Sequence, residues 1–113
     1  NVIEEMSVLG DVEGRNVVII DDMVDTAGTL VLAAQKMHEK GARSIRAFAT
    51  HPILSGNAVQ RIEDSPITEL VVTDSVPFVN NSEKIKILSI AEIFATTIQA
   101  VNLNQSISTN FVF

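Results

Sequence analysis

The fold is most constrained by a stretch near residue 20, where an apolar run changes abruptly into an acidic segment that contains glycine. Residues 17–20 are apolar and β-branched, which predicts a buried strand. Asp21 and Asp22 follow at once, and residues 25–29 form a small polar segment. The pattern then becomes helical, with four apolar residues on one face: Leu30, Ala33, Ala34 and Met37. A strand, a polar loop and a helix N-terminus in this order are typical of a site for a phosphorylated ligand.

Composition limits the class of protein. The chain has 113 residues, of which 46% are hydrophobic and 19% charged, so we expect a single globular domain over residues 1–113. The mean hydropathy of +0.27 is high for a small domain and indicates apolar surface that a second domain or subunit covers. The net charge of −6 provides no basic face for a nucleic-acid backbone, so we expect no nucleic-acid partner.

The absence of cysteine excludes disulfides, thiolate nucleophiles and cysteine-ligated zinc. No apolar run is long enough to cross a membrane and no signal peptide opens the chain, so we expect no membrane partner. These features together favour a cytoplasmic location.

Periodicity and turn signals divide the chain into alternating elements. We expect strands over residues 2–9, 16–20, 44–50, 69–74 and 84–88, and helices over residues 29–40, 57–62 and from 90 onward. The first two strands are expected to form a hairpin. Gly41 is expected to end the first helix, Ser55 to cap the second, and Ser89 to open a capping box for the third. This order predicts an α/β three-layer sandwich with a largely parallel sheet.

The last helix is expected to present an apolar face, because four residues recur at helical spacing: Ile90, Phe94, Ile98 and Val101.

The Asp21–Asp22 pair is the first candidate for chemistry. Adjacent carboxylates beside a buried strand repel each other, and a ligand with hydrogen-bond donors or a cation relieves this repulsion. A ribose offers two neighbouring hydroxyl groups, and Mg²⁺ offers charge. For an isolated pair, the simpler interpretation is that one aspartate caps the loop and the other is solvated. The adjoining loop favours the ligand.

The loop itself contributes small residues and two hydroxyl groups. Small side chains let backbone amides approach a phosphate closely, and the following helix points its N-terminus at the same place. The alternative is an ordinary helix start in which Thr29 is the N-cap and Gly28 serves the turn. The position of this loop, directly after a carboxylate pair that follows an apolar strand, makes the phosphate site the more specific interpretation.

Residues 17–29 resemble the ribose-phosphate binding motif of the type I phosphoribosyltransferase fold. Further matches extend the resemblance along nearly the whole chain to the ribose-phosphate pyrophosphokinase family. These are Ala49-Thr50-His51 with Ser55-Gly56, Val71-Val72-Thr73-Asp74, Lys84-Ile85-Lys86 and the tail Ser106-Ile107-Ser108. The first motif is specific to the fold group, and the others, in this order and spacing, indicate the pyrophosphokinase.

The resemblance implies a Mg²⁺-dependent transfer of the pyrophosphoryl group of ATP to the C1 hydroxyl of ribose 5-phosphate. It implies that Asp21 and Asp22 contact the ribose hydroxyls. The loop around the 5-phosphate is then formed by Asp25, Thr26, Ala27, Gly28 and Thr29. Ser106 and Ser108 match a tail that in family members helps to hold a regulatory phosphate or nucleotide at a subunit interface.

The resemblance covers only the second of the two similar domains of family members. Residues 1–113 are therefore expected to be the C-terminal half of a two-domain enzyme, with its own N-terminal domain and further copies of the chain as partners. In the family, the catalytic Lys and Arg and the metal-binding His and Asp lie in parts that this chain does not match. We expect no catalytic residue and no metal ligand within it, and little or no turnover by it alone.

Two other functions share the strand–loop–helix motif. One is a phosphoribosyltransferase that consumes phosphoribosyl pyrophosphate and a base, and the other is a non-catalytic synthetase-associated or regulatory homologue. The His51 loop and the Ser106 tail favour the pyrophosphokinase over the transferase. His51 itself is expected to be a hydrogen-bonded residue at a strand end, and His38 a surface residue on a helix rich in Lys and Glu.

Overall fold

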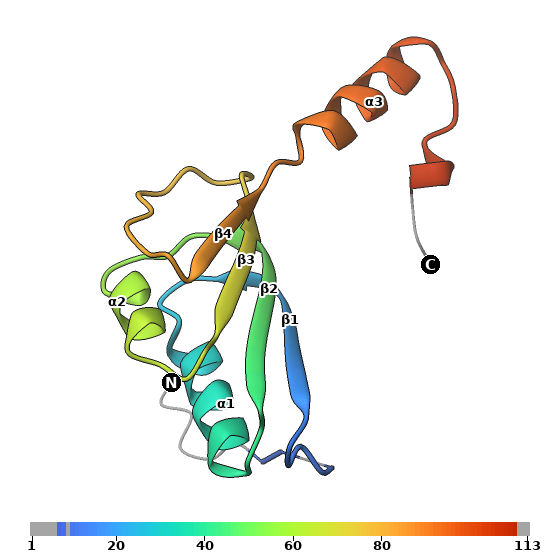
Figure 1. The fold of residues 1–113 in the computed structure, drawn as a ribbon. Coiled ribbons are helices and arrows are strands. Elements are labelled where there is room, and N and C mark those ends of the chain that lie inside the picture. Colours follow the sequence, from blue (N-terminus) through green and yellow to red (C-terminus); the bar gives the residue numbers. More distant parts are fainter. Residues whose placement is uncertain (1–6, 9, 111–113) are drawn as a thin grey trace.

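The structure is a computed structural model, and it describes residues 7–8 and 10–110 (Figure 1). Its elements are, in order, β1 (Asn16–Val24), α1 (Gly28–Glu39), β2 (Ser44–Pro52), α2 (Ala58–Glu63), β3 (Glu69–Thr73), β4 (Ile85–Leu88), α3 (Ala91–Asn102) and the 3₁₀ helix η1 (Ser108–Asn110). The strands form one sheet in the order β1-β2-β3-β4, and each neighbouring pair is parallel. The predicted α/β class with a parallel sheet is thereby confirmed. Most of the predicted strand over residues 2–9, and with it the hairpin, lies outside the described residues.

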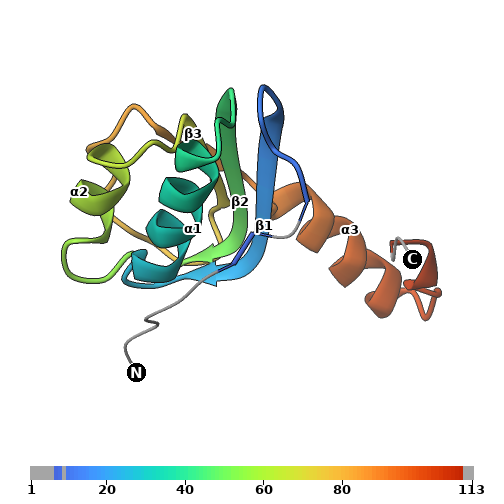
Figure 2. The same ribbon diagram turned by 90° about the horizontal axis from the view of Figure 1, so that it is seen from below.

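The hydrophobic core lies between the sheet and the two helices α1 and α2, which Figure 2 shows on the same side of the sheet. Its largest fully buried side chains are Ile45, Pro52, Ile62, Ile67, Leu70 and Val72. Helix α1 buries Leu30, Ala33 and Ala34, as the apolar periodicity predicts. Gly41 follows this helix with φ +85°, the left-handed conformation expected of it, and the Cγ of Glu13 lies only 3.2 Å from where a Cβ would stand.

On the opposite face of the sheet, which we call the open face, no helix packs in the described part of the chain. Helix α3 lies on that side in Figure 2, but Figure 1 shows that it projects beyond the end of the strands. Large apolar side chains are exposed on the open face: Val18, Ile20, Phe48 and Leu88. The described residues therefore supply two layers of the expected three. This exposed surface agrees with the high mean hydropathy, while its expected cover by a second domain or subunit stays a prediction.

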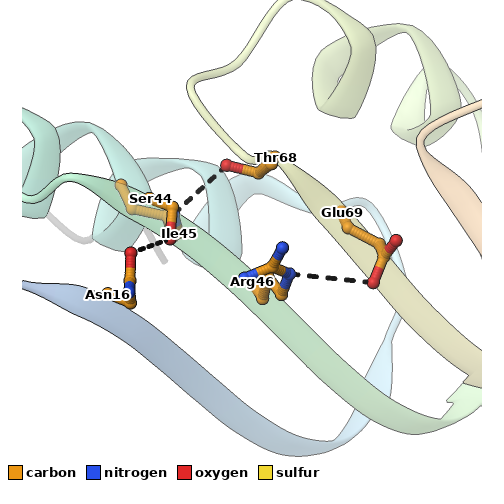
Figure 3. A network of polar contacts seen from close by, with 6 residues as sticks. All are labelled: Asn16, Ser44, Ile45, Arg46, Thr68 and Glu69. Carbon is orange, nitrogen blue, oxygen red and sulfur yellow. Dashed lines mark hydrogen bonds and ion pairs between the residues drawn. The ribbon is translucent and has the colours of Figure 1, made fainter.

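Polar side chains connect the first residues of three neighbouring strands (Figure 3). The Ser44 hydroxyl donates to the Asn16 Oδ1 at 2.7 Å and joins β2 to β1. The backbone N–H of Ile45 donates to the Thr68 Oγ1 at 3.3 Å, and the Arg46 Nε lies 3.9 Å from the Glu69 Oε1. These contacts lie at the amino ends of the strands. They therefore do not occupy the carboxyl ends, where the candidate site lies.

Lys84 fixes the position of α2. Its Nζ donates to the backbone carbonyls of Glu63 at 2.8 Å and Ser65 at 2.9 Å, at the C-terminal end of that helix. A cation suits this end of a helix because the last carbonyl groups carry partial negative charge. The Ser82 hydroxyl adds a hydrogen bond to the Glu63 carboxylate. The loop before β4 therefore holds α2 against the sheet.

Helix α3 projects away from the sheet (Figure 1) and buries none of its residues. Its predicted apolar stripe forms, but Phe94, Ile98 and Val101 are exposed. The predicted capping box differs from the structure, because the Ser89 Oγ accepts a hydrogen bond from the N–H of Ala91 at 3.2 Å instead of from Glu92. Asp74 takes over part of the capping role, since its Oδ1 accepts the N–H of Ile90 at 2.9 Å.

The junction between β4 and α3 should depend on pH through Asp74. Hydrogen bonds from the Ser89 hydroxyl and the Ile90 N–H lower the pKa of Asp74 below its ordinary value of 3.8. The two bonds are therefore fully formed above that value and are lost as the pH falls through the lower pKa of the folded state. In an NMR titration we expect the Asp74 carboxyl carbon and the Ile90 amide to titrate together with a midpoint below 3.8.

A Ser89→Ala variant should raise this midpoint toward the ordinary value, because it removes the larger of the two contributions to the pKa shift. A wild-type midpoint at or above 3.8, with no response of the Ile90 amide, would rule out this role of Asp74.

Candidate functional site

The site begins at the carboxyl end of β1. This strand continues through Asp21 and Asp22 to Val24, so the two aspartates do not end it as predicted. The reason is that pairing with β2 persists as far as Val24 and Pro52. Each aspartate accepts one hydrogen bond from the next backbone N–H at 2.8 Å. Both side chains are exposed, and neither carboxylate accepts another hydrogen bond within the described residues, so both can meet a ligand.

The loop between β1 and α1 consists of residues 25–27. Ala27, the last of them, has φ +61° and ψ +7°, a left-handed conformation that is unusual for a residue other than glycine. It is buried and serves as the N-cap of α1, and no side chain caps this helix end. The alternative in which Thr29 is an ordinary N-cap is therefore wrong, because Thr29 lies inside the first turn of α1.

Three successive carbonyl groups of this segment accept hydrogen bonds from one neighbouring segment, residues 54–61. The donors are the Leu54 N–H to the Val24 oxygen at 3.0 Å, the Ser55 N–H to the Asp25 oxygen at 3.1 Å, and the Arg61 Nη1 to the Thr26 oxygen at 3.0 Å. In a trans peptide the C=O and the following N–H point in opposite directions. The amides that follow these carbonyls therefore point away from residues 54–61.

The backbone N–H groups of residues 25–30 have no hydrogen-bond partner within residues 7–8 and 10–110. They comprise the loop amides and the first amides of α1, which a helix always leaves unpaired. A cavity of about 240 Å³ lies against them, lined by Asp21, Met23, Val24, Asp25, Thr26, Ala27, Gly28, Thr29 and Leu30. Six of the seven residues predicted for the ribose-phosphate site line this cavity, and Asp22 does not.

Charge in the site is mixed. Asp21 and Asp25 bring carboxylates to the cavity, while the N-terminus of α1 brings partial positive charge. Arg61, in the last turn of α2, places its guanidinium at the loop. This arrangement suits a ligand that carries hydroxyl groups at one end and an anionic group at the other.

Gly28 leaves room at the centre of the site. A Cβ built there would lie 3.7 Å from the Thr26 Oγ1 and 3.8 Å from the Arg61 Nη1, which are ordinary van der Waals distances. Its φ also lies outside the left-handed range. Neither packing nor backbone conformation therefore requires glycine at this position, which is consistent with a ligand atom approaching the backbone here.

The sequence predicts a different role for one residue near the site, Ser55, and no role for another, Arg61. Ser55 was expected to cap α2, but that helix has Asn57 as its N-cap, and the Ser55 hydroxyl bonds to the Asp25 carboxylate instead. The sequence analysis predicts no functional role for Arg61. The strand order could have indicated that both residues lie near the loop after β1. Both follow β2, and the carboxyl ends of neighbouring parallel strands meet at one edge of a sheet.

His51 lies near the end of β2, and its Nδ1 is 2.9 Å from the Ser75 Oγ. This agrees with the expected hydrogen-bonded residue at a strand end, and the ring does not line the cavity at residues 25–30. Ser106 and Ser108 follow α3, the helix that projects away from the sheet in Figure 1, and their hydroxyl oxygens are 2.7 Å apart. The structure does not bring these two serines together with the other predicted site residues.

Comparison of the sequence with protein families identifies the family of this chain. The family described as "Phosphoribosyl synthetase-associated domain" matches residues 3–112. The chain belongs to this family.

The chain is also similar to ribose-phosphate pyrophosphokinases. The chain is 46% identical to the one of Wolinella succinogenes over 112 residues, and 45% identical to that of Porphyromonas gingivalis over 113 residues. These matches cover 99% and 100% of this chain but only 36% of each relative. The chain thus spans about a third of the length of the curated relatives it matches.

Among solved structures, the chain is similar to phosphoribosylpyrophosphate synthetase from Mycobacterium smegmatis. The TM-score is 0.83 at 38% sequence identity, over 85% of this chain and 33% of that one. The fold and the resemblance predicted from the sequence are therefore confirmed.

Proposed function

We propose that this domain of the phosphoribosyl synthetase-associated family binds ribose 5-phosphate at the cavity of residues 21–30. The observation that carries the proposal is a row of amides over residues 25–30, which have no partner in the described part of the chain and lie beside the Asp21 carboxylate. Amides at a helix N-terminus bind phosphate, because their N–H groups and the helix dipole both favour an anion. Carboxylates accept hydrogen bonds from sugar hydroxyl groups. The site thus has hydrogen-bond donors for the phosphate and an acceptor for the ribose hydroxyl groups.

Asp22 would reach the ligand from outside the cavity. It is exposed, adjoins Asp21 in β1 and retains free lone pairs. A carboxylate on each side of the strand end can accept a hydrogen bond from a sugar hydroxyl group, which supports a sugar in preference to a simple phosphate.

We extend the proposal to the longer protein: it transfers pyrophosphate from ATP to ribose 5-phosphate and forms phosphoribosyl pyrophosphate. The names of the relatives support this reaction. This segment would supply the ribose 5-phosphate site, and the N-terminal domain would supply most of the ATP site. Homo-oligomers, a cytoplasmic location and a regulatory anion at Ser106 and Ser108 belong to the same proposal. No described helix combines the length and apolarity needed to span a membrane.

Mg²⁺ is the cofactor that the reaction implies. No cluster of three or more His, Asp or Glu side chains suited to a metal ion occurs among residues 7–8 and 10–110. Mg²⁺ is commonly held by one or two carboxylates together with substrate oxygens and water. The sequence predicts no metal ligand in this chain, but an exposed carboxylate such as Asp21 fits that mode, and the ion would there neutralise charge on the substrates.

Binding of ribose 5-phosphate should be measured by isothermal titration calorimetry in the presence of Mg²⁺. We expect the wild-type chain to bind ribose 5-phosphate but not free ribose, because the amides of residues 25–30 engage the phosphate. Asp21→Asn and Thr29→Ala should each weaken binding by about tenfold, since each removes a hydrogen-bonding group from the cavity.

Two variants serve as matched controls. Asp11→Asn changes an exposed carboxylate in the turn before β1, and Thr96→Ala removes an exposed hydroxyl from α3. Neither lines the cavity, so both should bind like wild type. The proposal fails if wild type gives no binding heat, or if the two site variants bind as tightly as the two controls.

Enzyme assays separate the candidate reactions. The longer protein should form phosphoribosyl pyrophosphate from ATP and ribose 5-phosphate, while this chain alone should show little or no turnover. Consumption of phosphoribosyl pyrophosphate with a purine or pyrimidine base would instead identify a phosphoribosyltransferase. Ligand binding without either reaction in the longer protein would identify a regulatory homologue.

A further inference from the structure

Arg61 is the basic side chain that the fold delivers to the loop from outside it. It lies in the last turn of α2, and its Nη1 donates to the Thr26 carbonyl at 3.0 Å. The same nitrogen lies 3.8 Å from the position of a Cβ on Gly28. The guanidinium is therefore in contact with the loop that forms one wall of the cavity.

The hydrogen bond from Arg61 fixes the orientation of one peptide group. Because the Thr26 carbonyl points at Arg61, the N–H of Ala27 points to the opposite side of the peptide plane. This N–H has no partner among the described residues. Ala27 has φ +61°, a conformation that an alanine adopts only when its surroundings hold it there. Arg61 provides that support from a separate element.

The position of Arg61 is itself well determined. Its neighbour Ile62 is fully buried in the core, and Lys84 holds the carbonyls at the end of α2. The hydrogen bonds from Leu54 and Ser55 hold only the first two carbonyls of the segment, at Val24 and Asp25. The third carbonyl, at Thr26, depends on Arg61.

We propose that Arg61 is a positioning residue, which holds the Thr26–Ala27 peptide so that the loop amides face the phosphate of the ligand. This inference rests on the proposed ribose 5-phosphate site. The residue acts through the loop backbone, and its charge also offsets the carboxylates of Asp21 and Asp25 at the cavity.

The test is an NMR comparison of three variants with wild type. Arg61→Met removes the donor and the charge, Arg61→Lys retains a charged donor, and Arg43→Met makes the same chemical change at an exposed residue just before β2. Amide spectra are recorded first without ligand and then during titrations with ribose 5-phosphate and with inorganic phosphate.

Without ligand, Arg61→Met should shift the amide signals of residues 26–29 and speed their hydrogen exchange, while signals from the sheet stay in place. The dissociation constant for ribose 5-phosphate should rise about tenfold or more, because a charge-assisted hydrogen bond is lost. Arg61→Lys should recover part of the affinity, and Arg43→Met should match wild type. Unchanged sheet signals show that a variant is folded.

Two results would overturn the inference, and they differ in what else they overturn. If wild type binds ribose 5-phosphate and Arg61→Met binds within threefold of it, or leaves the ligand-free loop signals unchanged, only the role of Arg61 is wrong. If wild type binds neither ribose 5-phosphate nor inorganic phosphate, the proposed site is wrong and the inference falls with it.

Discussion

Replacing Gly28 with alanine should weaken the binding of ribose 5-phosphate by about a hundredfold while leaving the fold intact. The added methyl group would lie 3.7 Å from the Thr26 Oγ1 and 3.8 Å from the Arg61 Nη1, so the protein accommodates it without a clash. It would also stand among the unpaired amides of residues 25–30, where it would keep a phosphate at a distance. Two charge-assisted hydrogen bonds lost at about 1.5 kcal/mol each account for the factor.

The Gly28→Ala variant should nevertheless be at least as stable toward unfolding as wild type. Gly28 is the first residue of α1, and alanine is favoured over glycine in a helix by up to about 1 kcal/mol. Urea unfolding followed by circular dichroism should therefore give a midpoint equal to or above that of wild type, while calorimetry shows the loss of binding. Unchanged affinity would mean that no ligand approaches the backbone at residue 28, whereas a lower midpoint would mean that Gly28 serves the fold.

Replacing Ile62 with alanine should produce the larger loss of stability, about 2–5 kcal/mol in the free energy of unfolding. Ile62 is fully buried, and it anchors the six-residue helix α2 in the core. Removing three carbon atoms from a site that cannot collapse leaves a cavity, and a helix this short has little stability of its own. Because α2 carries Arg61, the ribose 5-phosphate site should weaken as well.

Ile93→Ala in α3 is the matched control. The chemical change is identical, but the side chain is 62% exposed, so we expect a change of less than about 0.5 kcal/mol. Urea unfolding of both variants measures the difference directly. Equal losses would contradict the structure, because they would mean that α3 packs against the rest of the chain instead of projecting from it.

Much of the fold could be predicted from the sequence because local patterns coincide with tertiary packing. The β-branched run at residues 17–20 forms part of β1 as predicted, but the strand is not buried, because Val18 and Ile20 are exposed on the open face. The apolar residues of α1 face the core at the expected spacing. The glycine at residue 41 ends α1 because its φ of +85° favours glycine, and the Glu13 side chain leaves little room for a Cβ there. In these places one residue type suits both the local conformation and the packing.

Other features depend on partners that are distant in the sequence. Aspartate is disfavoured in strands, yet β1 includes Asp21 and Asp22 because its pairing with β2 continues on both sides of Asp22, as far as Val24. Ser55 has the sequence pattern of a cap, but Asp25, thirty residues earlier, lies close enough to bind it. The open face and the stripe on α3 show a similar limit: a pattern predicts that a surface is apolar, and it does not state what covers that surface.

The candidate site shows the same division. The spacing of Asp21, Asp25 and Gly28 predicts which residues line the cavity, because they belong to one strand–loop–helix unit. Arg61 could not be found in this way, since one exposed arginine on a short helix has no pattern that distinguishes it. Its role depends on where Ile62 and Lys84 place α2, and that is a property of the folded chain.

The most direct test of the ribose 5-phosphate site is a crystal structure of this chain with the ligand bound. We expect the phosphate oxygens to lie within hydrogen-bond distance, about 2.7–3.2 Å, of several backbone nitrogens of residues 25–30. The ribose hydroxyl groups should face the carboxylates of Asp21 and Asp22. A phosphate bound elsewhere on the chain, with the amides of residues 25–30 still unpaired, would contradict the proposed function.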